Sequence, residues 1–567
     1  MNNRLNPQYS LPADKNNDYN LGEFGLPCML TNADKGVKMI SLSPDLKKPN
    51  SWARFVTLLR QTVAKDRRVF FIDGVPHTAS INWLRDHVHE MKAYKHWEYD
   101  IKSYLDFMIE NQHPDGYFYE IACVHDNVHT KIVPDNCVKQ FPDDGIALVK
   151  IELEADIEYL VVEGAVTVFK ATGDEDWLKK VLPALEKGID YMTSDPKRWD
   201  EAHGLVKRPF TMDTWDFVYG CKGDDRRIYP TTPMSIMHGD NTGVYAAMIQ
   251  LAWINRRFGN EEKAASWEKR AAELKANLDK YCWNGKHYIH QLHLNHDGAE
   301  DADETNILSL SNTYDMNRGA TTPEQTESII NEYINRGKTS NTFAEFYCIH
   351  PPYTKFKNAD GGYWKVNEYV TGGLSTFTAG ELCKAAFQNG FEEYGWDILN
   401  RVRNMVMEDG NVHFLYHPET GKDMSGGPSG WGSAALLDAI DAGLAGIVDK
   451  DCCFRELDFS PRFAATEIEE IRYVTGYETS KRLVQTDYKI SPEGMAYQLL
   501  CPSQRVNCHI LLPKGKTCKE VYLNGEKIDF EISRVRNSDY VDFSFTKAPA
   551  EENKWEKLER QSIEIIF

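Results

Sequence analysis

Apolar positions recur with a helical period through the middle of the chain. Ile157, Leu160 and Val161 begin one such apolar stripe, which continues at Ala165. Loops rich in glycine and acidic residues separate these stretches; ATGDEDW (171–177), for example, combines a helix end with an acid-rich helix start. The pattern predicts helices over 84–111, 152–172, 175–193, 242–259, 261–279, 323–337, 373–389, 392–408 and 431–446.

The same helix–turn–helix pattern returns at FGNEEKA (258–264) and QNGFEEY (388–394), although the sequence itself does not repeat. Similar units without a repeated consensus favour a closed ring of helical hairpins over an open solenoid. We therefore expect a closed toroid of helical hairpins between Ile81 and Gly446.

The pattern differs at both ends of the chain. Residues 1–70 are irregular and rich in Pro, Asn and Lys, apart from one amphipathic stretch around 52–63. After Pro461 short alternating stretches follow, and Asn524-Gly525 is a typical hairpin turn. We predict a mainly α protein with three parts: an N-terminal arm over 1–75 packed on the barrel, a helical toroid over 76–460, and an antiparallel β-sandwich over 461–567.

The charge of the chain limits its partners. It has 65 Lys and Arg residues against 85 Asp and Glu residues, a formal net charge of −20, so neither nucleic acid nor an anionic membrane surface is an expected partner. No apolar run reaches the ~18 residues of a membrane span, and the N-terminus shows no secretory leader pattern. We expect a cytoplasmic protein, or a periplasmic one if a leader has been removed.

The sequence favours neither a metal nor a cofactor. The twelve cysteines include no CxxC pair, which indicates reduced, buried thiols. His87 and His89 point to different faces of a helix, and we interpret the acidic run at 297–304 as a solvated loop instead of a Ca²⁺ site. No nucleotide-binding loop, nucleophile elbow or HExxH motif is present. We therefore predict no cofactor and no metal.

Three loops are rich in both acidic and aromatic residues, and the first is SINWLRDHVHE (80–90). Arg85 and Asp86, side by side, can hold vicinal hydroxyls of a sugar, while Trp83 can stack on the apolar face of the sugar ring. The alternative interpretation is a helix cap with a surface ion pair.

The second loop is RPFTMDTWDFVYG (208–220), in which Asp213 and Asp216 lie three residues apart around Trp215. A carboxyl group packed among rings loses solvation, which raises its pKa and suits it to act as a general acid near neutral pH. The alternative is a loop acid that only caps a helix.

The third loop is DGGYWKVNEYVTGG (360–373), with Asn367 and Glu368 beside Trp364; Glu154 in ELEAD is a further acidic candidate. A lone acid is more often structural than catalytic, so the clustering of acids with rings carries the prediction. This composition favours acid/base chemistry by carboxylates in an aromatic-lined cleft, which is how glycosidic bonds are cleaved.

Four motifs resemble those of the (α/α)6-toroid glycoside hydrolases. They are W-L-R-D at 83–86, M-D-T-W-D-F at 212–217, G-G-P-S-G-W-G at 426–432, and G-L-A-G-I with L-x-F-S-P-R-F within 443–463. That superfamily includes trehalases, processing α-glucosidase I, mannosylglycerate hydrolase, glycogen-debranching glucosidases and α-L-rhamnosidases. The resemblance implies an (α/α)6 toroid and an exo-acting, inverting hydrolase. Such an enzyme removes a terminal sugar, with an α-glucoside-like linkage as first choice, from an oligosaccharide or small glycoside.

By this resemblance the general acid is Asp213 or Asp216, and the choice between them is open. Asp86 is expected to grip hydroxyls of the terminal sugar, with Arg85 and Trp83 beside it. Glu154, Trp215, Trp364, Asn367 and Trp431 complete the expected substrate-binding set.

The general base is the point at which this chain departs from the superfamily. Trehalase-like and α-glucosidase-I-like members carry a Glu shortly before a G-W-T segment, and Phe414 occupies that position here. Three explanations are open. The base comes from another loop, with Glu368 as first choice, or the enzyme is a phosphorylase, in which phosphate is itself the nucleophile and no carboxylate base is needed. In the third, the chain binds a sugar without cleaving it. A polysaccharide lyase on the same toroid, using His87, His89 or Tyr369, is a further alternative, which the net charge of −20 disfavours.

Overall fold

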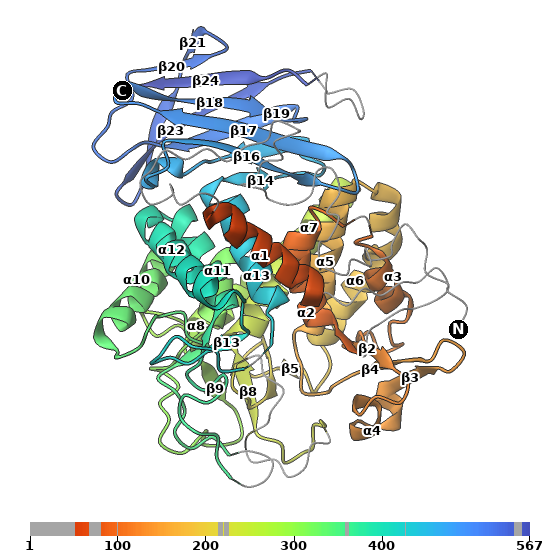
Figure 1. Ribbon diagram of the computed structural model, residues 1–567. Coiled ribbons are helices and arrows are strands. Elements are labelled where there is room, and N and C mark those ends of the chain that lie inside the picture. Colours follow the sequence, from red (N-terminus) through yellow and green to blue (C-terminus); the bar gives the residue numbers. More distant parts are fainter. Residues whose placement is uncertain are drawn as a thin grey trace.

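The computed structural model describes residues 51–66, 81–98, 100–213, 219, 226–357, 362–425, 427–548 and 558–567. A body of helices forms one part of the molecule, and a β-sandwich lies against one end of it (Figure 1). This arrangement confirms the expected order of a mainly helical part followed by a β part. None of the helices in the described ranges is long and apolar enough to cross a membrane.

Six helices contact one another in a closed cycle. In chain order they are α2 (Leu84–Tyr94), α5 (Ile157–Thr172), α7 (His238–Arg257), α9 (Ser311–Asn317), α11 (Thr376–Gln388) and α13 (Gly430–Asp438). Each packs against the next, and α13 packs against α2. Their side chains are buried almost all round, as expected for helices with neighbours on every side.

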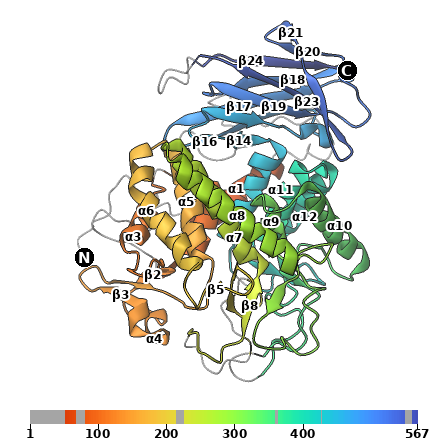
Figure 2. The same ribbon diagram turned by 180° about the vertical axis from the view of Figure 1, so that it is seen from behind.

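A second set of helices packs on the outside of this ring. They are α1 (Ser51–Asp66), α3 (Ser103–Glu110), α6 (Glu175–Met192), α8 (Glu261–Cys282), α10 (Pro323–Thr339) and α12 (Glu392–Asp409). α8 packs along α7 and α12 along α11, while α6 contacts both α5 and α7; the view from behind shows α6 and α8 on the outer side (Figure 2). Two of them begin with side-chain caps: at the start of α6 Asp174 accepts the Trp177 N–H at 2.9 Å, and at the start of α10 Thr322 and Gln325 form a capping box.

Two of the departures from the predicted helices have a clear physical cause. The segment 84–111, expected as one helix, is broken between α2 and α3, because the carboxylate of Asp100 accepts the backbone N–H groups of Lys102 (3.1 Å) and Ser103 (2.9 Å) and so starts a new helix. The short helix α9 was not predicted, since seven residues with mostly polar side chains (SNTYDMN) show no apolar period.

Short strands lie at the end of the helical ring that faces away from the sandwich (Figure 1). The largest sheet there has the order β1 (Ile81–Trp83), β2 (Ile121–Val124), β4 (Ile146–Val149) and β3 (Val138–Phe141). Smaller sheets join β7 (Arg208–Pro209), β8 (Met234–Met237) and β9 (Gln291–His293); β10 (Leu308–Ser309) and β11 (Ile349–His350); β12 (Leu374–Ser375) and β13 (Leu415–Tyr416); and β5 (Trp199–Asp200) and β6 (Leu205–Val206). A four-residue helix, α4 (His129–Ile132), lies beside β4. Strands of two to four residues are too short to show a period of two, which explains why the sequence indicated only loops here.

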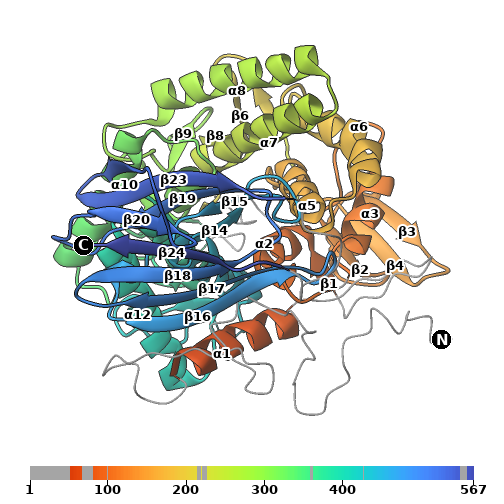
Figure 3. The same cartoon turned by 90° about the horizontal axis from the view of Figure 1, so that it is seen from above.

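The sandwich consists of two sheets, which overlie part of the helical body when the molecule is seen from above and leave α3, α6 and α8 in view beside them (Figure 3). One sheet has the order β14 (Ile447–Asp449), β15 (Glu456–Phe459), β19 (Arg505–Leu511), β23 (Ser538–Thr546) and β22 (Glu531–Val535). The other has the order β16 (Glu470–Tyr477), β17 (Arg482–Ile490), β18 (Gly494–Leu500), β24 (Gln561–Ile566), β20 (Glu520–Leu523) and β21 (Glu526–Ile528).

Pairing within the sandwich is antiparallel except between β15 and β19, which run parallel. β14 and β15 precede Pro461 and already belong to the first sheet. The predicted hairpin turn is confirmed: Asn524 and Gly525 join β20 to β21 with φ angles of 53° and 81°, as a type I′ turn requires.

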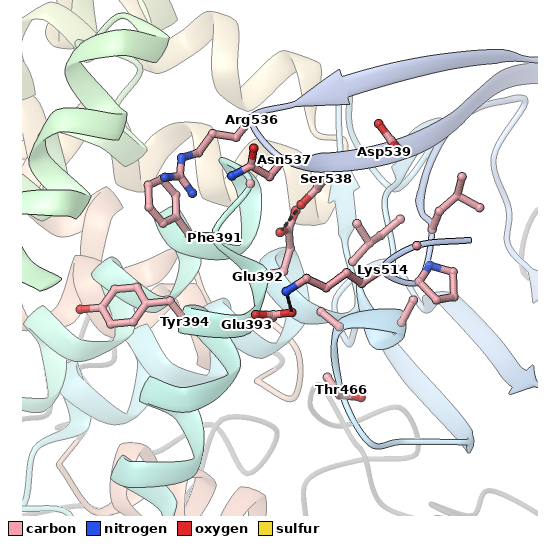
Figure 4. Close-up of a pocket in the computed structure, with 17 residues that line it drawn as sticks. Phe391, Glu392, Glu393, Tyr394, Thr466, Lys514, Arg536, Asn537, Ser538 and Asp539 are labelled. Carbon is pink, nitrogen blue, oxygen red and sulfur yellow. Dashed lines mark hydrogen bonds and ion pairs between the residues drawn. The ribbon is translucent and has the colours of Figure 1, made fainter. Parts of the chain in front are cut away.

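A pocket of about 390 Å³ lies where the sandwich meets the start of α12 (Figure 4). Across it, the Nζ atom of Lys514 lies 3.0 Å from a carboxylate oxygen of Glu393, and the Ser538 hydroxyl donates to Glu392 at 2.7 Å. These contacts attach the sandwich to the helical body.

At the N-terminal side, α1 contacts α2, α12 and α13 and occupies the amphipathic stretch noted in the sequence. Residues 1–50 and 67–80 of the predicted arm lie outside the described residues. The division of the chain into an arm, a toroid and a sandwich at residues 75 and 460 stays a prediction.

Candidate active site

The helices of the ring begin at the end of the molecule that carries the short strands. β1, β8 and β12 each end at the residue before α2, α7 and α11 begin, so short sheets fix the start of these helices. A helix N-terminus carries a partial positive charge and stabilises nearby carboxylates. Three acids occupy such positions: Asp86 in the first turn of α2, Asp156 just before α5, and Asp240 in the first turn of α7.

Arg85, in the first turn of α2, is the centre of a buried ion network. Its Nε and Nη2 atoms contact both carboxylate oxygens of Asp156, with 2.8 Å between Nη2 and Oδ1. Nη2 also donates to Glu154 at 2.7 Å, and Nη1 donates to Glu120 at 3.3 Å. Arg85 is only 8% exposed, so its guanidinium binds three carboxylates and not solvent.

A second arginine extends this network. The Nη2 atom of Arg208 lies 3.3 Å from Oε2 of Glu154, and its Nη1 atom lies 3.8 Å from Oδ2 of Asp240. The side chains of Arg208, Glu154 and Asp240 are fully buried. Four carboxyl groups thus contact Arg85 or Arg208, and Arg226 acts electrostatically on Glu154 and Glu120 as well. Among these described residues the carboxyl groups outnumber the guanidinium groups, so this part of the site has an excess of negative charge.

Burial and the neighbouring charges shift the pKa values of Glu120, Asp240 and Asp156 in different directions. Burial and the neighbouring Glu154 raise the pKa of Glu120 to about 8. Burial raises the pKa of Asp240 to about 6 despite the opposing effect of Arg208, with further increases from Asp156, Glu154 and Asp213. Burial also opposes ionisation of Asp156, but the charge and hydrogen bonds of Arg85 outweigh it and lower the pKa of Asp156. The site thus holds groups that bind protons near neutral pH beside one that stays ionised.

Asp213 lies next to this network and is held by its own set of hydrogen bonds. The Ser311 hydroxyl donates to Oδ1 of Asp213 at 2.8 Å, and the Asp213 N–H donates to Nε2 of His290 at 3.0 Å. The other ring nitrogen of His290 lies 2.8 Å from Glu304, which also accepts the Tyr353 hydroxyl at 2.8 Å. Asp213 is 1% exposed and its φ angle of 49° lies in the left-handed region, so the surrounding contacts define its orientation.

Aromatic side chains bring the second and third predicted loops together. Phe210 and Met212 belong to a buried hydrophobic cluster against which Trp364, Tyr369 and Phe414 pack. Trp83, from the first predicted loop, packs instead on the cluster of the four-stranded sheet, and its ring meets that of His129 edge-on at 5.2 Å.

The predicted site residues of the third loop are exposed or half-buried. Glu368 is exposed, and its Oε2 accepts the Lys365 N–H at 3.1 Å. The Asn367 amide donates to Glu419 at 3.4 Å, and the Trp364 ring stacks on Tyr369 with 5.9 Å between the centroids. The assignment of Glu368 as general base stays a prediction. Trp215 and Asp216 lie outside the described residues.

Trp431 lies between two other rings. Its centroid is 4.3 Å from that of His89 and 4.6 Å from that of Phe377, at interplanar angles of 4° and 20°. If both rings lay on the same face of Trp431, each about 3.5 Å above it, their centroids would be at most about 5.5 Å apart, which is too close for two rings side by side in one plane. The rings of His89 and Phe377 therefore cover opposite faces of Trp431. Its Nε1–H donates to the Tyr314 hydroxyl at 2.7 Å. We therefore leave Trp431, expected to bind substrate, out of the proposed binding surface.

Phe414, at the position of the superfamily base, packs against Phe377 with 5.4 Å between the ring centroids. A phenyl ring has no proton-accepting group, so Phe414 packs against a neighbouring ring at the position where trehalase-like members of the superfamily have a carboxylate.

Glu120, Arg208 and Asp240 were not predicted as site residues from the sequence. Glu120 follows three aromatic residues, Arg208 precedes the PFTMD stretch, and Asp240 begins a long helix. Only the last of these is a recognisable signal, because an acid in the first turn is typical of helix starts. Within the described residues no group of His, Cys, Asp or Glu side chains is arranged to hold a metal ion.

Comparison with known proteins gives the class of this domain. Residues 81–315 match the model of the mannosylglycerate hydrolase MGH1-like glycoside hydrolase domain. This match, over residues 81–315, confirms the expected resemblance to the toroid, or six-hairpin, glycoside hydrolases. No curated protein has a sequence that matches the chain.

Solved structures share the fold at low sequence identity. An α-L-rhamnosidase from Dictyoglumus thermophilum has a TM-score of 0.57 at 11% identity, over 94% of this chain and 50% of that one. An α-L-rhamnosidase from Streptomyces avermitilis, complexed with L-rhamnose, has a TM-score of 0.56 at 11% identity, over 93% of this chain and 42% of that one. The chain thus spans about half the length of these rhamnosidase structures, and the likeness concerns the fold.

Proposed function

We propose that this chain is an exo-acting, inverting glycoside hydrolase that removes a terminal sugar from an oligosaccharide or glycoside, with an α-glucoside-like linkage as the first candidate. The observation that carries the proposal is the cluster of buried carboxyl groups around Arg85 and Arg208, next to Asp213, at the strand-bearing end of the helical ring. The closed cycle of six helices is, in this proposal, the inner ring of an (α/α)6 toroid.

The proposed general acid is Asp213 or Asp216, which would protonate the leaving oxygen while water attacks the sugar from the opposite face. Inversion needs the acid and base carboxyl groups ~6.5–9.5 Å apart, so that a water molecule fits between them and the sugar. The hydrogen bond from Ser311 and the backbone contact with His290 support Asp213, because a fixed orientation is what a proton donor to a defined oxygen requires.

Two carboxyl groups compete for the role of general base. Glu368 lies in the loop whose Trp364 and Tyr369 pack against the hydrophobic cluster of Phe210 and Met212. This packing supports a position of Glu368 near Asp213. Asp240 is buried, and the charge of Asp213 acts directly on it, so it is the second candidate. Arg85 is engaged by three carboxylates; we assign it the role of orienting these acids, with the half-buried Asp86 beside it for sugar hydroxyls.

The deciding experiment is turnover of a panel of aryl α- and β-glycosides and disaccharides, with and without inorganic phosphate, followed by NMR of the released sugar. Hydrolysis without phosphate that releases the inverted anomer supports the proposal. Turnover that requires phosphate identifies a phosphorylase, retention of configuration overturns the inverting mechanism, and sugar binding without turnover identifies a non-catalytic relative.

A further inference from the structure

Exposed apolar side chains gather at one place beside the candidate site. Among the described residues, seven large hydrophobic side chains are at least two-fifths exposed. Three of them, Phe343 (48%), Tyr363 (44%) and Val366 (46%), lie on two neighbouring segments. We call these three side chains, with Asn367 and Glu419, the rim patch.

Direct contacts make the rim patch continuous. The Phe343 N–H donates to the carbonyl of Pro418 at 2.6 Å, and its ring covers Gly421, where an added Cβ would lie 2.8 Å from the ring atoms. The same turn carries Glu419, which accepts the amide of Asn367 at 3.4 Å. Phe343 and the segment 363–367 therefore flank a single turn.

The rim patch also connects to the candidate site. The Trp364 N–H, next to Tyr363, donates to the carbonyl of Phe356 at 3.0 Å. The Phe356 ring lies 5.4 Å from that of Phe210, which precedes Asp213 by three residues in the same loop. Tyr363 thus lies on a segment that packs, through Phe356, against the loop of the proposed acid.

The chemistry of the rim patch suits an uncharged, hydroxylated chain. Flat rings offer faces for the apolar C–H surface of a sugar, while the amide of Asn367 and the carboxylate of Glu419 offer hydrogen bonds to hydroxyl groups. Lys365 and Glu368 lie on the first segment, and Glu419, Lys422 and Asp423 lie on or beside the turn. Charges of both signs are therefore mixed, and an anionic polymer has no preferred binding face.

We propose that the rim patch is an aglycone-binding surface: it holds the sugar units beyond the bond to be cleaved, so the preferred substrate is a neutral oligosaccharide of several units. The inference rests on the proposed function, because it requires the terminal unit of that oligosaccharide to enter the candidate site. Stacking on Phe343 and Tyr363 then contributes to binding only when the ligand is long enough to reach them.

The test compares ligand lengths. The wild type and the double variant Phe343→Ala/Tyr363→Ala are assayed on gluco-oligosaccharides and manno-oligosaccharides of about two to six units and on the matching aryl monosaccharide. The ratio of kcat/KM for the longest to the shortest substrate should fall about ten-fold in the double variant, as expected for loss of two stacking contacts. Ile532→Ala, an equally exposed apolar residue on β22 of the sandwich, should leave the ratio unchanged.

Binding is measured separately by calorimetry in the Asp213→Asn background, so that failure of catalysis and failure of the rim patch are distinguishable. If no oligosaccharide is cleaved but longer chains bind more tightly and the double variant loses this gain, the proposed function fails and the rim patch stands. If oligosaccharides are cleaved or bound without dependence on length, the rim patch proposal is overturned. It is equally overturned if the double variant converts a dimer to a monomer in light scattering with no change in the ratio, because the face would then be an interface between two copies.

Discussion

Replacement of Glu120 by Gln should stabilise the protein, and the gain should grow with pH. Glu120 is one of four carboxyl groups that contact two guanidinium groups, and burial with the neighbouring Glu154 raises its pKa to about 8. A carboxyl group whose pKa is raised in the folded state resists ionisation there, so it makes folding less favourable as pH rises from its ordinary value of 4.5 towards 8. Gln resembles the protonated acid in shape and keeps an oxygen that can accept the Arg85 Nη1–H bond.

The size of the effect follows from the pKa difference. Each unit corresponds to about 1.4 kcal/mol, so the difference between 4.5 and about 8 limits the gain to roughly 5 kcal/mol. At about pH 5.5 the expected gain in the free energy of unfolding is roughly 1 kcal/mol, and at about pH 7.5 it is roughly 4 kcal/mol. Below about pH 4.5 wild type and variant should be equally stable.

Urea unfolding followed by tryptophan fluorescence at several pH values measures these differences. Glu158→Gln is the matched control: Glu158 is as buried as Glu120, but it pairs with Lys150 at 3.1 Å, so its replacement leaves a buried ammonium group without its partner and should destabilise the protein. A Glu120→Gln variant that is less stable than wild type at pH 7.5, or whose gain does not increase with pH, would refute the account of excess negative charge.

Three further predictions concern the proposed reaction. Asp213→Asn should lower kcat by about 1,000-fold with the fold retained, measured by turnover and circular dichroism; near-normal turnover would transfer the role of acid to Asp216. Gly239→Ala should lower kcat as well, because an added Cβ would lie 2.4 Å from the Ser311 hydroxyl and displace the donor to Asp213; Ser311→Ala should reproduce the loss. Glu368→Gln and Asp240→Asn distinguish the two candidate bases. Whichever variant removes the general base should abolish hydrolysis and regain activity with added azide, because azide replaces water as the nucleophile. The other variant should show no effect of azide.

The sequence predicted those parts of the fold that long, regular patterns determine. Helices such as α5, α6 and α12 follow continuous apolar stripes with recognisable starts and ends, and the Asn524-Gly525 turn follows from backbone geometry alone. The helix α9 and the short strands were missed because two to seven residues hold no period, and tertiary packing decides their conformation.

The candidate site could be predicted only in part. Asp213 was recognisable because acids and rings are adjacent in its loop. Glu120 and Asp240 lie 120 residues apart in sequence, and only the folded ring brings them to the same pair of arginines. The environment that raises their pKa values is therefore a property of the tertiary structure, which no local motif encodes.

The closed cycle of helices has a consequence for biosynthesis. The contact between α2 and α13 closes the ring, and nearby the Gly430 N–H donates to Asp66 at 2.7 Å across 364 positions of sequence. At about 5–20 residues per second, a ribosome needs roughly 20 to 70 s to add the residues between these two helices. Throughout that time the apolar flank of α2 that α13 will cover remains open, so this nascent chain is a substrate for chaperones well before its last inner helix is made.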